Sequence, residues 1–131
     1  MNKDVNAKEH MQKSVEILEH ALPPDHPDLA KEYGCLAKFE EDSGNLVEAE
    51  RLRHKSVLIR ERSLPAGHPG LATGYSNLAS IKLRLNNLAE AERLFRMALA
   101  IQEKSLPKAH ADTLKSLTSL ATCYYSAPKS R

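Results

Sequence analysis

The chain contains no tryptophan, and aromatic residues make up only 5% of its 131 residues. Any core must therefore be built from aliphatic side chains and alanine, which suit helices that pack at close range. Glycine is also scarce, with 5 residues, which argues against many tight β-turns. No apolar run approaches the roughly 18 residues of a membrane span, and residues 1–10 are too polar for a signal peptide. We therefore expect a soluble protein without a membrane partner.

The charge balance gives little support to a polyanionic partner. The net charge is +2 with histidine neutral, and lysine and arginine are interleaved with aspartate and glutamate along the chain. Domains that bind nucleic acid usually carry a clustered basic face instead. We therefore expect no nucleic-acid partner.

The motifs of enzymes and metal proteins are also missing. His26, His68 and His110 recur at equal spacing, but metal ligands must converge on one point, and these three lie in successive loops. No His-Glu-x-x-His pair, phosphate-binding loop or nucleophile elbow occurs. We therefore predict no enzymatic activity, no metal site and no cofactor.

One short segment occurs three times and organises the rest of the chain. It reads Leu-Pro-x-x-His-Pro at residues 22–27 and 64–69, and Leu-Pro-x-x-His at residues 106–110. Residues 22–63 and 64–105 share about nineteen identities in about forty-two aligned positions. A fixed period of this length indicates stacked repeats, so function should be sought on a surface.

Apolar residues recur at three- and four-residue spacing in six segments, which predicts six helices. The predicted helices span residues 4–21, about 27–42, 46–63, 69–85, 88–106 and 111–125. They form a single domain over residues 1–131, which contains a half repeat (4–21), two complete repeats (22–63 and 64–105), a second half repeat (106–126) and a tail (127–131) that we expect to be frayed.

The loops carry the signals that end and begin helices. Gly44 is the best candidate for a left-handed residue after the second helix, and Asn86-Asn87 makes the corresponding turn in the next repeat. Either Asp25 or His26 caps the helix that follows the first loop. The expected inner residues are Ala7, Met11, Val15, Leu18 and Leu22; Leu29, Tyr33, Leu36, Ala37 and Phe39 or Glu40; Ala49, Leu52, Val57 and Ile59; Tyr75, Leu78, Ala79 and Ile81; Ala91, Leu94, Phe95, Ala98 and Ile101; and Leu114, Leu117, Leu120, Ala121 and Tyr124.

The two cysteines, Cys35 and Cys123, are separated by two repeats. Each repeat advances a stack of helices by roughly 10 Å, whereas a disulfide needs Cα atoms within about 7 Å. Neither cysteine has a metal-ligand spacing. We expect two unpaired packing residues and a reduced, cytoplasmic location.

The repeat resembles the tetratricopeptide repeat in the 42-residue variety found in kinesin light chains. The resemblance rests on Leu-Ala pairs in the first helices, on Ala49 and Ala91 twelve residues later in the second helices, and on the His-Pro-Asp loop at residues 26–28. The Leu-Ala pairs are Leu36-Ala37, Leu78-Ala79 and Leu120-Ala121. Arg53 and Ser56 depart from the pattern, because the second copy has Phe95 and Ala98 there, and they predict a less tightly packed first pair.

The resemblance implies an all-α, right-handed superhelical solenoid of antiparallel helix pairs. It also implies a non-catalytic scaffold whose first helices line a concave groove that binds an extended peptide. Gly34 and Lys38 stand where a two-lysine, two-asparagine clamp for a terminal carboxylate would need Lys and Asn, so that specificity is not expected. The predicted groove residues are Lys31, Lys38, Thr73, Asn77, Ser80, Arg84, Lys115, Ser119 and Thr122, with Gly34 and Cys35 in the same stripe.

Four cations in this stripe favour an acidic peptide, while Glu41 and Asp42 lie at its edge. Two other functions remain open. The half repeats at the two ends leave apolar faces that could pair with another copy, which would make the chain a self-assembling, dimeric or helix-swapped scaffold. Alternatively, the repeats belong to a larger signalling protein as a sensor or regulatory segment.

Overall fold

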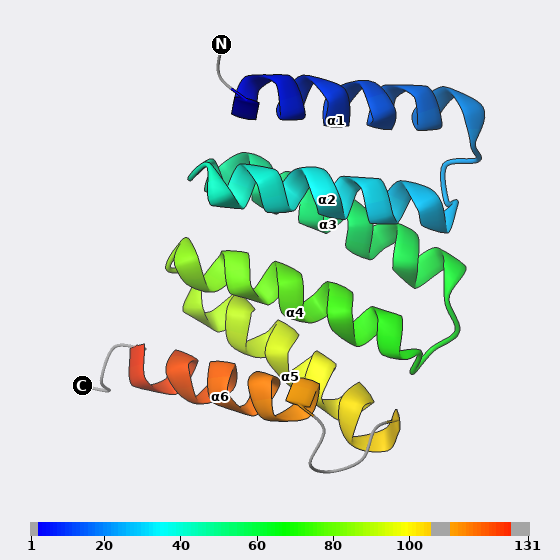
Figure 1. The fold of residues 1–131 in the computed structure, drawn as a ribbon. Helices are drawn as coiled ribbons and strands as arrows, with labels where there is room; N and C mark the ends of the chain where they lie inside the picture. The colour runs from blue at the N-terminus through cyan, green and yellow to red at the C-terminus, as the bar shows by residue number, and fades with distance from the viewer. Residues whose placement is uncertain (1–2, 106–110, 127–131) are drawn as a thin grey trace. The chain divides into compact units, whose positions relative to one another are not determined.

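The computed structural model describes residues 3–105 and 111–126, and these residues form six helices without a strand (Figure 1). Every helix lies within one residue of the predicted bounds. The prediction of an all-α fold is therefore confirmed for the described residues. The helices are α1 (Lys3–Ala21), α2 (Pro27–Asp42), α3 (Leu46–Ser63), α4 (Pro69–Arg84), α5 (Leu88–Ser105) and α6 (Ala111–Ser126).

The chain divides into two compact units, Met1–Ser63 and Leu64–Arg131. In the first unit, α2 and α3 run side by side, joined by a three-residue turn, and α1 packs against α2 (Figure 1). In the second unit, α4 and α5 form the corresponding pair, and α6 packs against α5. Each unit therefore contains one complete helix pair and one additional helix. The single domain over residues 1–131 stays a prediction.

A histidine side chain caps the first helix of each complete pair. His26 Nδ1 accepts a hydrogen bond from the Asp28 backbone N–H at 3.0 Å, and His68 Nδ1 accepts one from Gly70 N–H at 2.8 Å. The next residue is a proline. It has no N–H, which costs nothing at the first helical position, because an N–H there would have no partner within the helix. The cap is therefore His26 rather than Asp25, and helix capping explains the periodic histidines. His110 lies outside the described residues.

Left-handed residues end the first helix of each pair, as the sequence predicts. Gly44 has φ 86°, and Asn86 has φ 66° at the equivalent position, 42 residues later. The next backbone N–H closes the turn: Asn45 donates to the Glu40 carbonyl, and Asn87 donates to the Lys82 carbonyl, both at 2.8 Å. These turns direct the second helix of each pair back along the first.

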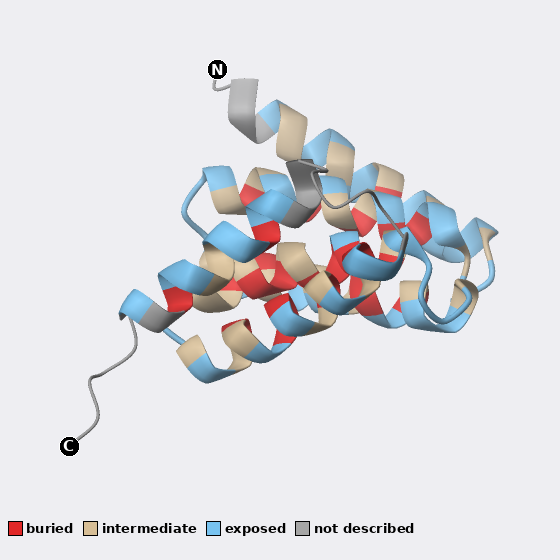
Figure 2. Ribbon diagram, turned by 90° about the horizontal axis from the view of Figure 1, so that it is seen from below, coloured by how far each residue is buried: buried red, intermediate tan, exposed pale blue. Residues whose placement is uncertain are grey.

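The core of each unit lies between its paired helices, where the buried residues face one another (Figure 2). In the first unit, Ala37, Ala49 and Leu52 are each at most 1% exposed, and Ala37 and Leu52 belong to one cluster. The stripe on α1 packs against this core through Val15, Met11, Leu18 and Leu22. Of the two alternatives at the end of α2, Glu40 is the buried residue, only 2% exposed, whereas Phe39 is half-buried.

Phe95 is the largest fully buried side chain of the second unit. It packs among the predicted inner residues of α4 and α5, of which Ala79 and Ala98 are completely enclosed. Ile101 is a correction, because it is half-buried rather than buried. The aliphatic, alanine-rich core expected from the composition is thus present in both units.

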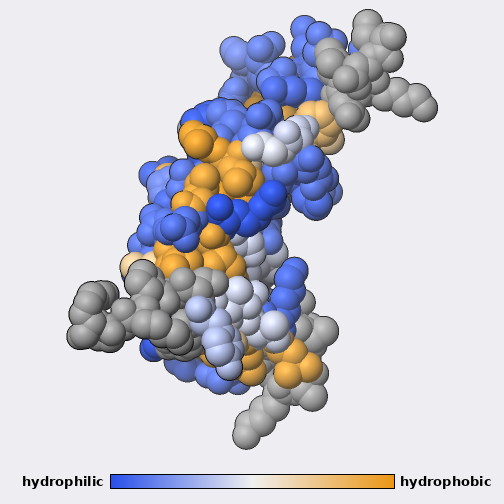
Figure 3. Space-filling model, turned by 90° about the vertical axis from the view of Figure 1, so that its left-hand side faces the viewer, coloured by the Kyte–Doolittle hydropathy of each residue, from blue (hydrophilic) through white to orange (hydrophobic). Residues whose placement is uncertain are grey.

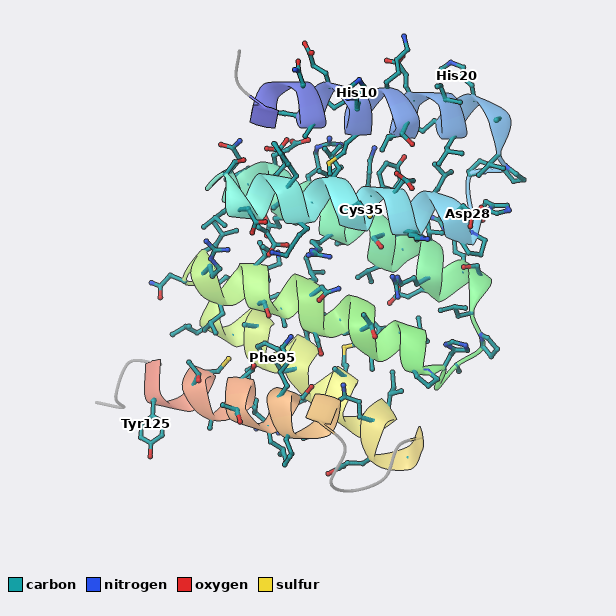
Figure 4. The ribbon with its side chains drawn as sticks, in the orientation of Figure 1. His10, His20, Asp28, Cys35, Phe95 and Tyr125 are labelled. Carbon is teal, nitrogen blue, oxygen red and sulfur yellow. The ribbon has the colours of Figure 1, made fainter. Side chains whose placement is uncertain are left out.

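The expected inner face of α6 is largely open to solvent. Leu114 is 52% exposed and Leu117 is 44% exposed, and Ala121 is exposed as well. Instead, Ser116 and Cys123 are the buried residues of this helix. Figure 4 shows the Tyr125 ring projecting away from α6. The prediction for Tyr124, for the loop at 106–110 and for the tail at 127–131 falls outside what the structure describes.

Candidate functional site

A polar pocket of about 140 Å³ opens within the second unit. Three helices of that unit contribute to its wall, and every lining side chain carries a hydroxyl, an amide or an ammonium group. Three of the predicted groove residues meet here. The lining residues are Thr73, Ser76 and Asn77 of α4, Gln102 of α5, and Lys115 and Ser116 of α6.

Helical spacing accounts for the arrangement of this pocket. Thr73, Ser76 and Asn77 are at positions i, i+3 and i+4 of α4, so they share one face of the helix. The Ser76 hydroxyl lies 3.5 Å from the Ser116 hydroxyl, which brings α4 and α6 together at the pocket. Ser116 is buried, whereas Lys115 beside it is exposed at the rim.

The sequence reasoning missed three lining residues, Ser76, Gln102 and Ser116, of which Gln102 is the most unusual. Its side chain is 5% exposed, and its Oε1 atom has no hydrogen-bond partner. A buried amide oxygen without a donor is uncommon in folded proteins, because burial removes its hydration without a replacement. The available signal was a polar residue directly after Ile101, on a face expected to be apolar. The pocket therefore contains an unused acceptor at its base.

The other predicted groove residues of the second unit lie outside this pocket. Ser80 and Ser119 are half-buried, and Arg84 is exposed. Thr122 is also exposed, and its hydroxyl donates to the Thr118 carbonyl of its own helix at 3.0 Å. None of these four residues lines the polar pocket.

The remaining two predicted residues, Lys31 and Lys38, are exposed on α2 in the first unit. The Lys38 ammonium lies 2.8 Å from the Asp42 carboxylate, one helical turn away. Exposed ion pairs of this kind are weak, but the pairing reduces the positive charge that Lys38 presents. The net positive charge of the predicted groove is thus smaller than its sequence suggests.

The first unit has a second hollow, of about 320 Å³, between its three helices. The Tyr33 hydroxyl donates to Glu19 Oε2 at 2.5 Å, and the Lys55 ammonium lies 5.1 Å from the centre of the Tyr33 ring. Burial and this hydrogen bond to Glu19 raise the pKa of Tyr33 to about 12. An ion pair, between Arg51 and Glu48 at 2.5 Å, lies in the wall of this hollow.

The two cysteines have different surroundings. Cys123 is 2% exposed, and burial, together with the charge of Glu92, raises the pKa of its thiol. It is the packing residue that the sequence predicts. Cys35 is a correction, because it is a free thiol exposed on α2 rather than a packing residue (Figure 4). The expectation that neither forms a disulfide agrees with two free cysteines.

In the described part of the chain, no three residues among the His, Cys, Asp and Glu side chains are grouped closely enough to hold a metal ion. Within those same residues, no helix combines the length and the apolar character that crossing a membrane requires.

The sequence model of the tetratricopeptide repeat matches residues 32–104 and 75–129. Two solved structures from Podosopora anserina, described as kinesin light chain nearly identical TPR-like repeats, share 27% identity with this chain at TM-scores of 0.88 and 0.87. Each match covers 95% of this chain, which spans 58% and 59% of the two solved chains. No curated protein matches this chain closely enough to count as a relative.

The chain belongs to the tetratricopeptide repeat family, and its repeats are of the kinesin light chain type. Its fold is an all-α repeat solenoid. Tetratricopeptide repeats generally mediate contacts between proteins, and such folds are typically non-catalytic scaffolds. These are the properties that the resemblance in the sequence implies.

Proposed function

We propose that this chain is a non-catalytic interaction module that binds an extended segment of a partner protein along the exposed faces of its first helices. The observation that supports the proposal is the polar pocket of the second unit, where Thr73, Asn77 and Lys115 lie together. These three residues come from two different first helices, α4 and α6. A segment lying across both helices would contact all three.

The chemistry of the pocket suits a peptide. The Asn77 amide can donate and accept hydrogen bonds at the same time, as the main chain of an extended peptide requires. The Thr73 hydroxyl already lies 3.4 Å from the Pro69 carbonyl of its own helix. It can still accept from a ligand. Asn77 would therefore fix the position of the segment along the groove.

Charge would favour acidic residues in the flanks of the segment. In the second unit, Arg84 and Lys115 are exposed cations; in the first unit, Lys31 is exposed and Lys38 is paired with Asp42. Exposed cations of this kind increase the rate of association with an acidic peptide and fix its register more than they increase its affinity. Salt screens their attraction to the peptide. We propose a partner in the cytoplasm, since both cysteines are free thiols.

The test is a peptide array probed with the whole chain at low and moderate salt. Asn77→Ala removes the proposed backbone contact, and Arg84→Glu reverses one groove charge. The matched control is Lys104→Glu, which makes the same kind of charge reversal at an exposed residue of α5 outside the predicted stripe.

We expect Asn77→Ala to weaken binding about tenfold on all peptides, in line with the loss of a buried hydrogen bond. Arg84→Glu should weaken acidic peptides selectively and reduce their salt dependence. Binding that survives both changes, or falls equally with Lys104→Glu, would contradict the proposed groove.

A second candidate function is self-assembly, and the open face of α6 favours it. Leu114, Leu117 and Ala121 of α6 are exposed. Their equivalents 42 and 84 residues earlier, at the same helical positions, are all buried. These equivalents are Ala72, Tyr75 and Ala79 in α4, and Ala30, Tyr33 and Ala37 in α2.

Helix α1 also has an exposed apolar residue, on the face that a second helix turns toward its first helix. Ile17 is 57% exposed, although its equivalent in α3, Ile59, is buried against the first helix of the pair. Helix α1 corresponds by the period to a second helix, and α6 corresponds to a first helix. The α1 helix of one copy could therefore complete the pair that α6 of another copy begins.

Light scattering over a range of protein concentrations tests this candidate. Assembly should grow with concentration and be abolished by Leu117→Glu. The control Val47→Glu changes another exposed apolar residue, on α3, and should leave assembly intact. Apolar side chains are not confined to α6 on the surface, as the orange patches of Figure 3 show, so the control is needed. A strict monomer at high concentration would exclude self-assembly.

A further inference from the structure

The polar pocket of the second unit has an unequal supply of donors and acceptors. The Lys115 ammonium can donate to a ligand, and so can whichever of the Ser76 and Ser116 hydroxyls does not donate to the other. Gln102 Oε1, by contrast, is an acceptor that has no donor from the protein. A ligand that satisfies this pocket must therefore donate to Gln102 at its base and accept from the groups above it.

We propose that the pocket binds the side-chain carboxamide of an asparagine or glutamine in the partner segment. The inference rests on the proposed peptide-binding function and specifies which side chain anchors the segment. The ligand NH₂ donates to Gln102 Oε1, and the ligand carbonyl oxygen accepts from Lys115 or from the one serine hydroxyl, Ser76 or Ser116, that does not donate to the other. A carboxamide is the common side-chain group that does both through a planar head.

Other side chains leave part of the pocket unsatisfied. A carboxylate has only acceptor atoms, so it would face Gln102 Oε1 without a proton between them. A lysine or arginine head has only donors and would be repelled by the Lys115 ammonium. An aliphatic group would leave Gln102 Oε1 without a donor. Acidic residues of the segment therefore belong in its flanks rather than in this pocket.

Size and depth agree with a side-chain head group. Gln102 is 5% exposed and its oxygen is almost completely enclosed, so a ligand reaches this oxygen only by displacing the groups that cover it, and a peptide main chain remains at the rim. The volume of about 140 Å³ is several times the roughly 10–15 Å³ that a single water molecule needs. A carboxamide with its neighbouring methylene groups fits this space.

Propionamide and propionate provide a matched pair of probes, because they have the same shape and differ in the NH₂ group. Each is titrated into the ¹⁵N-labelled whole chain, and the NMR resonances of residues 76, 102 and 116 are followed. We expect propionamide to cause saturable shifts and propionate to bind at least about tenfold more weakly, because an unpaired site atom rejects an analogue that lacks the donor. Equal or tighter binding of propionate, or no saturable shift with propionamide, overturns the proposal.

Two substitutions separate the acceptor from the rest of the side chain. Gln102→Leu removes the oxygen and should weaken propionamide at least about tenfold. Gln102→Glu keeps an acceptor oxygen and should retain propionamide within about threefold. If Gln102→Glu weakens propionamide as much as Gln102→Leu does, Gln102 acts through its own NH₂ group and the proposal is wrong. Gln12→Leu, on α1, is the control for the same chemical change at an exposed position.

The probes also separate this inference from the proposed function. Peptides that bind through Asn77 while propionamide does not would overturn the carboxamide pocket and leave the interaction module intact. Binding of propionamide without any peptide binding would leave a small-molecule pocket and remove the module. Comparison of the two probes on the unaltered chain needs no variant, so the test stands even if a substitution fails to fold.

Discussion

The two complete repeats share one backbone plan but fill equivalent positions with different chemistry. Arg53 in the first repeat corresponds to Phe95 in the second, and Ser56 corresponds to Ala98. In the first unit, the side chains of Glu40, Arg53 and Ser56 have partners. In the second unit, Gln102 has a buried oxygen without one. The comparison sets polar residues that support the fold beside the one polar residue that we propose meets a ligand.

The buried carboxylate and the buried hydroxyl of the first unit each have partners. Glu40 accepts a hydrogen bond from Asn45 Nδ2 at 2.8 Å and lies 3.3 Å from the Lys8 ammonium. The Ser56 hydroxyl donates to the Ala30 carbonyl at 2.9 Å. Such groups cost little once paired, and their main effect is to fix one arrangement of the helices.

Arg53 has a partner too, and its contact replaces apolar packing. Its guanidinium lies 2.6 Å from the Glu41 carboxylate, with both side chains largely buried. The equivalent residues of the second repeat, Phe95 and Leu83, are apolar. The same helix pair is thus joined by an ion pair in one unit and by an aromatic side chain in the other.

Truncation of Phe95 should have the largest effect on stability. Phe95→Ala removes a fully buried ring and should lower the free energy of unfolding by about 3–5 kcal/mol. The matched change in the first unit, Arg53→Ala, should cost about 1–2 kcal/mol, because it removes charged hydrogen bonds instead of a large apolar side chain. Urea denaturation followed by circular dichroism measures both.

Amide hydrogen exchange shows which of the two units loses stability in each variant. Phe95→Ala should accelerate exchange mainly in α4 and α5, and Arg53→Ala mainly in α2 and α3. Equal costs for the two substitutions would show that the ion pair supports its unit as strongly as the ring does, which would contradict the comparison.

Removal of the buried carboxylate should have the next largest effect. Glu40→Ala takes away the acceptor of Asn45 and the partner of Lys8, and we expect a loss of about 2–3 kcal/mol. Glu40→Gln keeps an acceptor for Asn45 and should lose less. The free energy of unfolding in urea distinguishes the two, and a neutral Glu40→Ala would mean that the turn after α2 holds without the carboxylate.

The buried hydroxyl should contribute about 1 kcal/mol. Ser56→Ala removes its hydrogen bond to Ala30 and makes the first repeat match the second. The reciprocal change, Ala98→Ser, inserts a hydroxyl into the completely enclosed position of the second repeat. It should destabilise by a similar amount through crowding. A stabilising Ser56→Ala, measured by thermal unfolding, would show that the hydroxyl carries no structural benefit.

The thiols should differ in reactivity without any change in stability. Cys35 is exposed, whereas Cys123 is buried and its pKa is raised, so Cys123 has less thiolate at any given pH. Iodoacetamide at pH 8 should alkylate Cys35 at least about tenfold faster, as judged by mass spectrometry of tryptic peptides. A higher pH should narrow the difference only partly, because burial still limits access. Equal rates would contradict the burial of Cys123.

The helices could be predicted to within one residue because their signals are local. Proline at the first helical position, the left-handed residues Gly44 and Asn86, and the three- and four-residue spacing of apolar side chains all act within a few residues of the chain. Local sequence also explains the histidine caps, although it left Asp25 and His26 as alternatives.

The site depends on contacts between helices, which spacing alone does not determine. Thr73, Asn77 and Lys115 could be predicted, because helical spacing places each of them on the groove face of its helix. Gln102 and Ser116 could not be assigned this way, because their burial depends on how α5 and α6 pack. The open face of α6 has the same origin: Leu114 and Leu117 fit an inner stripe by spacing, but the helix turns Ser116 and Cys123 inward instead.

The most direct test of the account is an NMR titration of the whole chain with a peptide selected from the array. The side-chain NH₂ resonances of Asn77 and Gln102 report on the pocket, while those of Asn6 and Gln12, exposed on α1, serve as internal controls. We predict that the Asn77 and Gln102 resonances shift together and saturate with the binding curve, while the controls stay fixed. Saturable binding that leaves Asn77 and Gln102 unmoved would contradict the assignment of function to this pocket.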